Sequence, residues 1–378
     1  MAMPLDDVAV VDLGSPTPGK YATFLLAQTG AVVVRVDRPG ARGAPLDDED
    51  RVLNRGKRSL TLDLRQEAGQ DVLHRLVAAA DVLVESYRPG VSERLGADWP
   101  TLSKINPKLV CCSLSGFGQT GPDRSLPAYD LNLAGLSGLL SALFGVEAAP
   151  RVPEAFVADG VSGLTATVAI AMALLERQRT GEGRWLDLAM LDSTFSLLGV
   201  SHGLGQSTGD DAAEPTSSSP WYSIYETADG AYVTLAAIRP ASMDILCREI
   251  GQPELAEAVA TGESGTAVAA ALREAFKTAP AADWIERLRP MGVEIGRVHR
   301  PGDAFDDAQL RARGLVEDVV TEDGATRPIV TSPFRPIWGR ADEASRSAPR
   351  AGRDCDEILG ELGYEAADIA RLRENGTI

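Results

Sequence analysis

Short apolar runs rich in β-branched residues alternate with helical patterns over the first 115 residues. The runs predict strands at 8–13, 32–37, 60–64, 82–85 and 109–114, with helices between them such as 21–28 and 72–77. Strands of this kind that alternate with helices indicate a parallel α/β sheet. Because such sheets bind ligands at the carboxyl ends of their strands, the loops after these runs are the expected place for a site.

The longest apolar segment, 164–175, follows a glycine-flanked acid, Asp159, in the stretch Phe156-Val157-Ala158-Asp159-Gly160. Small and aliphatic residues on every side of the segment predict a helix that is buried all round. Asp159 would lie at the N-terminal end of this helix, where the macrodipole is positive. One interpretation is an ordinary N-cap, which the local sequence favours. The other is a carboxylate nucleophile or base at the edge of a pocket.

Polar segments divide the chain. A Gly/Ser/Pro-rich stretch at 205–220 predicts a linker, and a second loop is expected at 341–347. Between them, Asp229-Gly230 predicts a hairpin that amphipathic helices follow. We therefore expect a large domain over 1–205 and a small domain over 221–325.

Composition narrows the class of protein. The chain has 378 residues, 44% hydrophobic content and a net charge of −17, which suits a globular protein and argues against nucleic-acid or anionic-membrane binding. The four cysteines show no CxxC or Cys/His spacing, so neither a disulfide framework nor a metal site is expected. Cys111 and Cys112 lie in a predicted strand and are expected as buried thiols. Without a signal core or a run of about 20 apolar residues, a cytoplasmic protein with no membrane span is expected.

The corner after the first predicted strand resembles a phosphate-binding loop in part. Gly14 to Lys20 satisfies G-x-x-x-x-G-K, but Tyr21 stands where a magnesium-binding Ser or Thr is required. Pro16 and Pro18 also remove two backbone donors. The better interpretation is a tight turn that packs a helix against the sheet.

Basic residues gather near the predicted strand ends. Arg35, Arg38 and Arg42 follow the second run, Asn54–Arg58 precedes the third, and Arg88 and Arg94 flank the turn at 87–91. In an acidic chain, this clustering suggests a site for a phosphate-rich ligand. Ordinary solvated surface is the alternative.

These segments carry a family resemblance. The chain resembles the family III CoA-transferase and α-methylacyl-CoA racemase superfamily over nearly its whole length. The matching stretches are VRVDRP at 34–39, NRGKRS at 54–59, ADVLVESYRPGV at 80–91, GFGQTGP at 116–122, YD at 129–130, ADG at 158–160, RTGEG at 179–183, ADGAYV at 228–233 and ILGELGY at 358–364.

The resemblance implies a Rossmann-like large domain completed by 335–378, a smaller α+β domain, and an interlocked homodimer. It implies no permanently bound cofactor and no metal, with coenzyme A as part of the substrate. CoA is expected along the large domain, and the residues expected to hold it are Arg38, Lys57, Tyr87, Arg88 and Arg94.

Two chemistries share this fold. A transferase needs one carboxylate that attacks the thioester, whereas a racemase needs two bases on opposite faces of the α-carbon. In the racemase branch, the bases are a His-Asp pair, the acid of the central turn and a Glu in the small domain. Here the resemblance places Tyr129, followed by Asp130, at the His position and Arg239 at the Glu position, so only Asp159 remains. We therefore predict CoA transfer from an acyl-CoA to a carboxylic acid through an aspartyl-CoA thioester on Asp159, with Tyr129 and Asp130 as further catalytic residues. Racemisation at C2 is the alternative, and a non-catalytic acyl-CoA-binding paralogue is a third possibility.

Overall fold

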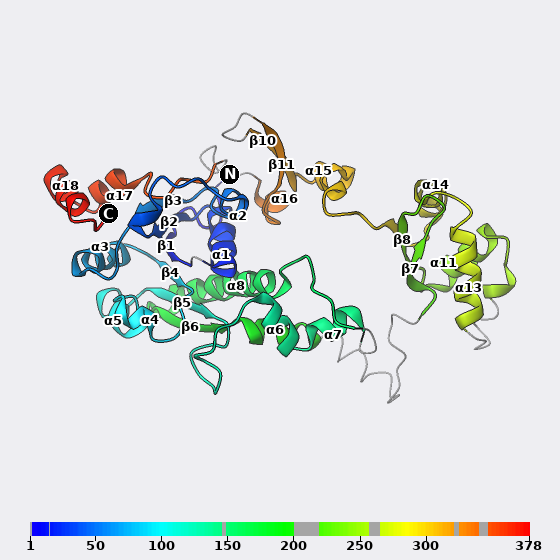
Figure 1. Ribbon diagram of the computed structural model, residues 1–378, viewed down its shortest axis with the longest axis horizontal. Helices are drawn as coiled ribbons and strands as arrows, with labels where there is room; N and C mark the ends of the chain where they lie inside the picture. The colour runs from blue at the N-terminus through cyan, green and yellow to red at the C-terminus, as the bar shows by residue number, and fades with distance from the viewer. Residues whose placement is uncertain are drawn as a thin grey trace. The chain divides into compact units, whose positions relative to one another are not determined.

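The protein is described by a computed structural model that covers 2–14, 16–145, 149–199, 219–256, 265–320, 325–339 and 347–378. It divides into two compact units, one formed by Met1–His202 with Ala308–Ile378 and the other by Gly203–Asp307 (Figure 1). Most of the predicted linker at 205–220, and all but the last residue of the predicted loop at 341–347, lie outside the described residues.

The first unit is built on a six-stranded parallel sheet, as predicted. Its order is β3-β2-β1-β4-β5-β6, which is the strand order of the Rossmann fold. The strands are β1 (Ala9–Leu13), β2 (Val32–Asp37), β3 (Arg58–Thr61), β4 (Val82–Glu85), β5 (Val110–Ser115) and β6 (Arg184–Ala189). The sequence pattern missed β6, an edge strand that has no β-branched residue and interrupts its apolar positions with Asp187. The sequence pattern also predicted a start at residue 60 for β3, two residues after its observed start at Arg58.

Successive strand residues face two separate hydrophobic cores. Val10 and Cys112 belong to one core, and their neighbours Val11 and Cys111 belong to the other. Cys111 and Cys112 are buried free thiols, as predicted. The helices of the first layer are α1 (Thr17–Ala27), α6 (Asp130–Leu136) and α8 (Val157–Thr180), and those of the second are α3 (Glu67–Ala78), α5 (Trp99–Ile105), α17 (Cys355–Glu361) and α18 (Ala366–Glu374). The sheet is therefore buried on both faces, as parallel sheets are.

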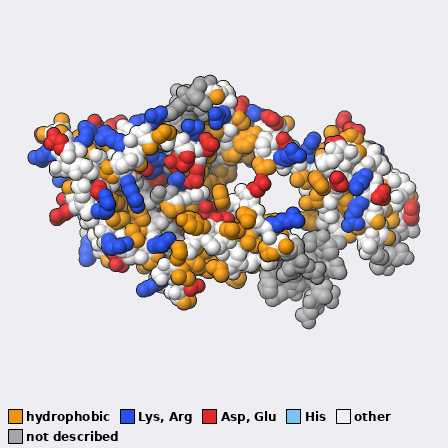
Figure 2. All heavy atoms as spheres, in the orientation of Figure 1, with side chains coloured by type: hydrophobic (Ala, Val, Ile, Leu, Met, Phe, Trp, Pro, Cys, Tyr) orange, Lys and Arg blue, Asp and Glu red, His pale blue; other side chains and the backbone are white. Residues whose placement is uncertain are grey.

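Helix α8 is buried on only one side in the single chain, so the prediction of burial all round is wrong here. Ala166 and Ile170 are fully buried, whereas Val168 and Met172 are 50% and 64% exposed. Figure 2 shows hydrophobic side chains gathered over the region of α6 and α8. By length and composition alone α8 could also cross a membrane, but the core helix of a soluble protein meets the same criteria.

The second unit is α+β. Its antiparallel sheet and helices are β7 (Tyr222–Glu226), β8 (Tyr232–Ala236), β9 (Ile295–Arg297), α11 (Pro240–Glu249), α13 (Gly265–Phe276) and α14 (Ala281–Leu288). The predicted hairpin at Asp229-Gly230 is confirmed, with Gly230 at a φ of 72°. Phe276 anchors the core, because its ring lies 5.0 Å from those of both Tyr225 and Trp284.

The segment after the second unit returns to the first and includes more residues than predicted. It begins at Ala308 rather than 335, and the small unit ends at Asp307 rather than 325. The hairpin of β10 (Val316–Val320) and β11 (Thr326–Val330) is held to the first unit by Arg55, which donates to the Val330 carbonyl at 2.7 Å. The remaining described helices of the first unit are α2 (Asp48–Leu53), α4 (Val91–Arg94), α7 (Leu139–Phe144), α9 (Met190–Ser196), α15 (Ala308–Ala312) and α16 (Arg335–Trp338), with a short 3-10 turn at Pro39–Ala41. The 3-10 turns Arg289–Met291 and Asp303–Asp306 belong to the second unit.

Candidate active site

The glycine-rich corner after β1 is a tight turn, as the sequence indicated. A Cβ atom added at Gly19 would lie 2.5 Å from the Ser86 hydroxyl oxygen and 2.8 Å from Cα of Gly14. Glycine therefore lets the start of α1 approach the loop that follows β4. This close approach occurs where the strand order reverses direction, between β1 and β4. Open α/β sheets bind their ligands at such a point.

A cavity of about 350 Å³ lies at this end of the sheet. It is lined by Pro16, Thr17, Pro18, Ser86, Tyr87, Arg88, Pro89, Leu114, Ser115, Gly116, Arg124, Leu126, Ala128, Tyr129, Asp159 and Met190. These residues follow the carboxyl ends of β1, β4, β5 and β6 or lie at the first turn of α8. The structure thus brings four of the predicted site residues, Asp159, Tyr129, Tyr87 and Arg88, to one cavity.

Asp159 is not the N-cap of α8. The N-cap is Phe156, and Asp159 is the third residue of the helix, with its side chain on the cavity wall. Close packing against α1 fixes this end of the helix, since a Cβ at Gly163 would lie 2.9 Å from the Pro18 carbonyl. The N-cap interpretation is therefore wrong, and a polar role toward the cavity remains for this carboxylate.

The surroundings of Asp159 raise its pKa to about 6. Burial contributes most, followed by the negative charges of Asp130 and Glu49, while an interaction with the Thr17 hydroxyl lowers the pKa. A carboxyl group with this pKa is mostly ionised at neutral pH and more basic than an exposed aspartate. The sequence analysis missed Thr17 and Glu49, because neither lies in a recognisable motif.

Tyr129 and Asp130 occupy adjacent positions but face different surroundings. Tyr129 is the N-cap residue of α6 and is 79% exposed at the cavity. Asp130 is only 8% exposed, and its Oδ1 accepts a hydrogen bond from the Asp159 backbone N–H at 3.0 Å. Asp130 therefore positions the first turn of α8, whereas the phenol of Tyr129 can reach a ligand.

The residues predicted to hold CoA are distributed unevenly. Arg38 follows β2 and lies close enough to Tyr87 to lower its pKa, which burial nevertheless raises to about 12. Arg88 is adjacent on the cavity wall, and Arg94 lies exposed at the end of α4. A basic surface thus follows the ends of β2 and β4.

Lys57 does not belong to this surface. Its side chain is fully buried, and its ammonium group contacts Asp12 Oδ2 at 2.9 Å, Thr23 Oγ1 at 2.8 Å and Asn54 Oδ1 at 3.0 Å. Burial lowers the pKa of Lys57, and the Asp12 carboxylate opposes that change. The geometry corrects the expectation that Lys57 contacts phosphates, because a phosphate cannot reach a buried ammonium already held by four oxygens, the fourth being the Lys20 carbonyl at 3.2 Å.

Arg239, at the position where racemases carry a Glu, lies in the second unit. It forms an ion pair with Glu294 and donates to the Gly292 carbonyl at 3.0 Å.

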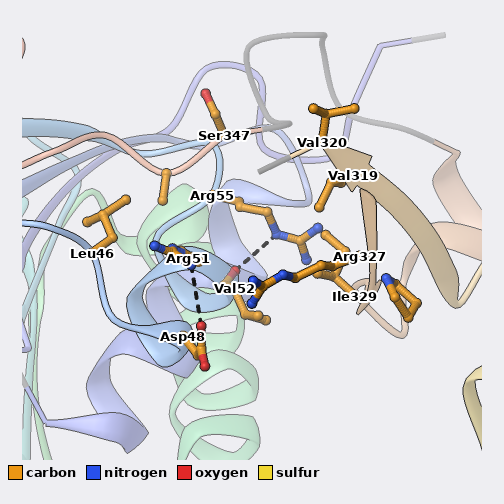
Figure 3. A pocket seen from close by; sticks show the side chains of 12 residues that line it. Leu46, Asp48, Arg51, Val52, Arg55, Val319, Val320, Arg327, Ile329 and Ser347 are labelled. Carbon is orange, nitrogen blue, oxygen red and sulfur yellow. Dashed lines mark hydrogen bonds and ion pairs between the residues drawn. The ribbon is translucent and has the colours of Figure 1, made fainter. Parts of the chain in front are cut away.

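A second cavity of about 340 Å³ lies in the first unit between α2 and the β10–β11 hairpin. Figure 3 shows Arg51, Arg55 and Arg327 around it. Arg55 donates to the carbonyls of Val52 and Val330 and so connects α2 to the hairpin. Among the described residues that line this second cavity, Asp48 is the one acid, and it forms an ion pair with Arg51 at 3.5 Å. We therefore take the cavity that Asp159 lines as the candidate active site.

Comparison with known proteins shows the family of the chain. The chain matches CoA-transferase family III over residues 5–355. It belongs to this family. Among its relatives, alpha-methylacyl-CoA racemase from Homo sapiens is 32% identical, with 100% of this chain and 98% of the racemase covered. Acetyl-CoA:oxalate CoA-transferase from Acetobacter aceti is also 32% identical, with 83% of this chain and 85% of the transferase covered.

The fold of this family III member has a close counterpart among solved structures. A CAIB/BAIF family protein from Brucella suis superposes with a TM-score of 0.82 at 30% identity, covering 96% of this chain and 100% of that one. The predicted family and fold are therefore confirmed. Its relatives include both racemases and CoA-transferases, so this family III member is an acyl-CoA-processing enzyme.

Proposed function

We propose that the protein transfers CoA from an acyl-CoA to a carboxylic acid, with Asp159 as the nucleophile. One observation carries the proposal: among the described residues that line the cavity, Asp159 is the one carboxylate, and its pKa is about 6. An ionised, partly desolvated carboxylate is suited to attack a thioester carbonyl. The relatives named as CoA-transferases support the same chemistry.

The proposed reaction proceeds in balanced steps. A carboxylate oxygen of Asp159 attacks the thioester carbon, and CoA leaves as the thiolate, which gives a mixed anhydride. The thiolate then attacks the Asp159 carbonyl carbon, so that the donor acid leaves as a carboxylate and an aspartyl-CoA thioester remains. The acceptor carboxylate repeats these steps in reverse order. The new acyl-CoA forms, and the Asp159 carboxylate is restored.

Residues around Asp159 support this sequence in distinct ways. Asp130 fixes the backbone of Asp159, and the N-terminal end of α8 provides a positive field for negative charge that develops there. Arg38, Arg88 and Arg94 are proposed to contact the CoA phosphates. Tyr129 is positioned to donate its phenolic hydrogen to an acyl oxygen at the cavity.

Racemisation at C2 of an acyl-CoA is the second candidate function. The similarity to a racemase over 100% of this chain favours it. Against it, racemisation needs two bases that exchange a proton on opposite faces of the substrate. No histidine lies among the described residues that line the cavity, and Tyr129 stands where the racemase branch has one. The cavity therefore supports transfer better.

Trapping of the covalent intermediate tests the proposal. Acyl-CoA supplied without acceptor should convert Asp159 to a CoA thioester, which hydroxylamine or borohydride traps on the peptide that contains Asp159. The same incubation in deuterium oxide should place little deuterium at C2. Rapid deuterium incorporation without an adduct would instead establish racemisation. Neither product, with CoA still bound, would indicate a non-catalytic acyl-CoA-binding protein.

A further inference from the structure

The second cavity of the first unit has no role in the steps above. Three parts of the chain surround it, namely α2 with the residues just after it, the β10–β11 hairpin and the returning segment at Ser347. Arg55 joins two of these parts, because it donates to the carbonyls of Val52 at 3.1 Å and of Val330 at 2.7 Å. Arg55 is only 4% exposed, so a buried guanidinium forms part of the cavity wall.

The described lining residues carry an excess of positive charge. Arg51 in α2, Arg55 just after it and Arg327 in β11 line the cavity, whereas Asp48 is the one acid among them. Figure 3 shows the Arg327 side chain extending from the hairpin toward α2. In a chain with a net charge of −17, three guanidiniums at one cavity indicate a ligand with a negatively charged group.

The ion pair between Asp48 and Arg51 does not close the cavity to an anion. The two side chains are 3.5 Å apart, and the Asp48 side chain is 91% exposed. Ion pairs of exposed side chains contribute little to stability, because water solvates the separated charges well. A ligand anion can therefore replace Asp48 as the partner of Arg51.

The rest of the wall is aliphatic. The apolar lining residues are Leu46, Val52, Val319, Val320, Pro328, Ile329 and Ala348. In the register of the hairpin, Val319 lies opposite Arg327, and Ile329 lies two residues beyond Arg327 on the same face. Apolar surface thus adjoins a guanidinium, and a ligand that fits both has an aliphatic part next to its negative group.

Helix α2 separates this cavity from the one at Asp159. Asp48, Arg51 and Val52 line the second cavity, whereas Glu49 and Asp50 form ion pairs with Lys20 of α1 at 3.2 and 2.8 Å. Among the described residues, none lines both cavities. A ligand in the second cavity would therefore leave the Asp159 cavity open.

We propose that the second cavity binds a free aliphatic carboxylate at a site separate from the reaction site. The carboxylate would accept hydrogen bonds from Arg51 and Arg327, and the chain would lie against Val52, Val319 and Ile329. A volume of about 340 Å³ is at the small end for ligand cavities and suits a short chain. The choice of a carboxylate rests on the proposed function, because CoA transfer consumes one free acid and releases another.

Methyl NMR of the full chain tests the site at one residue. In protein with methyl-labelled isoleucine, the Ile329 signal is the one that Ile329→Val removes. Sodium hexanoate should shift this signal saturably. Acetate, which lacks the chain, and hexanol, which lacks the charge, should each bind at least about tenfold more weakly. Because no acyl-CoA is present, failure of this site and failure of transfer at Asp159 can be told apart.

Substitution of the two arginines tests their role. Arg327→Gln and Arg51→Gln should each weaken hexanoate binding at the Ile329 signal by about fivefold or more, because each removes a charged hydrogen-bond donor. Arg327→Lys should recover part of the loss. Arg55 is left unchanged, since it connects α2 to the hairpin. Arg179→Gln is the matched control and should have no effect, because Arg179 is exposed in the last turn of α8 and lines neither cavity.

Four results would overturn the assignment. No shift of the Ile329 signal with hexanoate would show that the cavity does not bind the acid. Equal binding of hexanol would show that the arginines do not recognise a charge. Equal binding of acetate would reduce the site to a simple anion site. Displacement of hexanoate from the Ile329 signal by saturating CoA would assign the cavity to the CoA site.

Discussion

The Oδ1 atom of Asp130 accepts a hydrogen bond from the backbone N–H of Asp159 at 3.0 Å. This bond joins the first turn of α6 to the first turn of α8, two segments 29 residues apart. It also places a second negative charge beside the Asp159 side chain, and this charge raises the pKa of Asp159. Asp130 thus positions Asp159 and, after burial, contributes to its raised pKa.

Asp130→Asn should shift the pH dependence of the reaction. In the wild type, kcat/KM should fall as the pH drops through about 6, because Asp159 becomes protonated. The amide oxygen of Asn can still accept the Asp159 N–H, but the charge that raises the pKa is gone. The acidic limb of the profile should therefore move to lower pH. An unchanged limb would contradict the assigned effect of Asp130, and Asp130→Ala, which also removes the acceptor, should lower kcat.

Asp159→Asn should stabilise the protein near pH 8 while it abolishes transfer. The pKa of Asp159 is about 6 in the folded protein and close to 4 when unfolded, so ionisation between these values disfavours folding. After allowance for the partly exposed side chain, we expect a gain of about 1 kcal/mol in the free energy of unfolding. Urea titrations at fixed protein concentration should show the gain at pH 8 and little of it at pH 4.5. A destabilised variant at pH 8 would refute this prediction.

Lys57→Met should strongly lower the free energy of unfolding and should have little direct effect on CoA binding. The substitution leaves the Asp12 carboxylate buried without its cation, and such a change typically costs about 3–5 kcal/mol. Urea denaturation would measure the loss. Arg38→Ala serves as the control and should change the free energy of unfolding by about 0.5 kcal/mol or less. Similar stability of both variants would show that Lys57 is not the structural cation of this core.

Arg38→Ala should weaken CoA binding in a salt-dependent way. Arg38 lies beside Tyr87 at the ends of β2 and β4, where a phosphate is proposed to bind. Calorimetry at low salt should show weaker CoA binding than in the wild type, and added salt should shrink that difference. Arg179→Ala is the control for general charge loss. Equal CoA affinity of the wild type and Arg38→Ala would refute the phosphate contact.

We expect the chain to form a homodimer through the exposed side of α8. Leu164, Val168, Met172 and Leu175 form one apolar stripe along the helix, and all four are exposed in the single chain. Light scattering should give twice the 40.0 kDa of one chain. Met172→Glu should lower the apparent mass or the melting temperature, because it buries a charge if the stripe is an interface. Val320→Glu, at another exposed apolar residue, should change neither. A compact, active monomer would refute the expectation.

The periodicity of apolar residues in the sequence was enough to predict most of the fold. Five of the six parallel strands and the β7–β8 hairpin followed from short-range patterns, because alternation between faces and turn chemistry are properties of neighbouring residues. The missed strand, β6, is an edge strand whose pairing with β5 supplies what its sequence lacks. The place of Asp159 at the start of a long apolar helix was also readable, since a lone acid before an apolar run is a local feature.

Only the tertiary structure decided what surrounds each charged side chain. Lys57 lies in a basic segment that looks like solvated surface, but its partner Asp12 is 45 residues away and encloses it in the core. The exposed stripe of α8 has larger apolar residues than the buried side, where small residues predominate, so hydrophobicity alone predicted burial of both sides. Burial and charge proximity arise from contacts distant in sequence, and these determine both pKa values and binding sites.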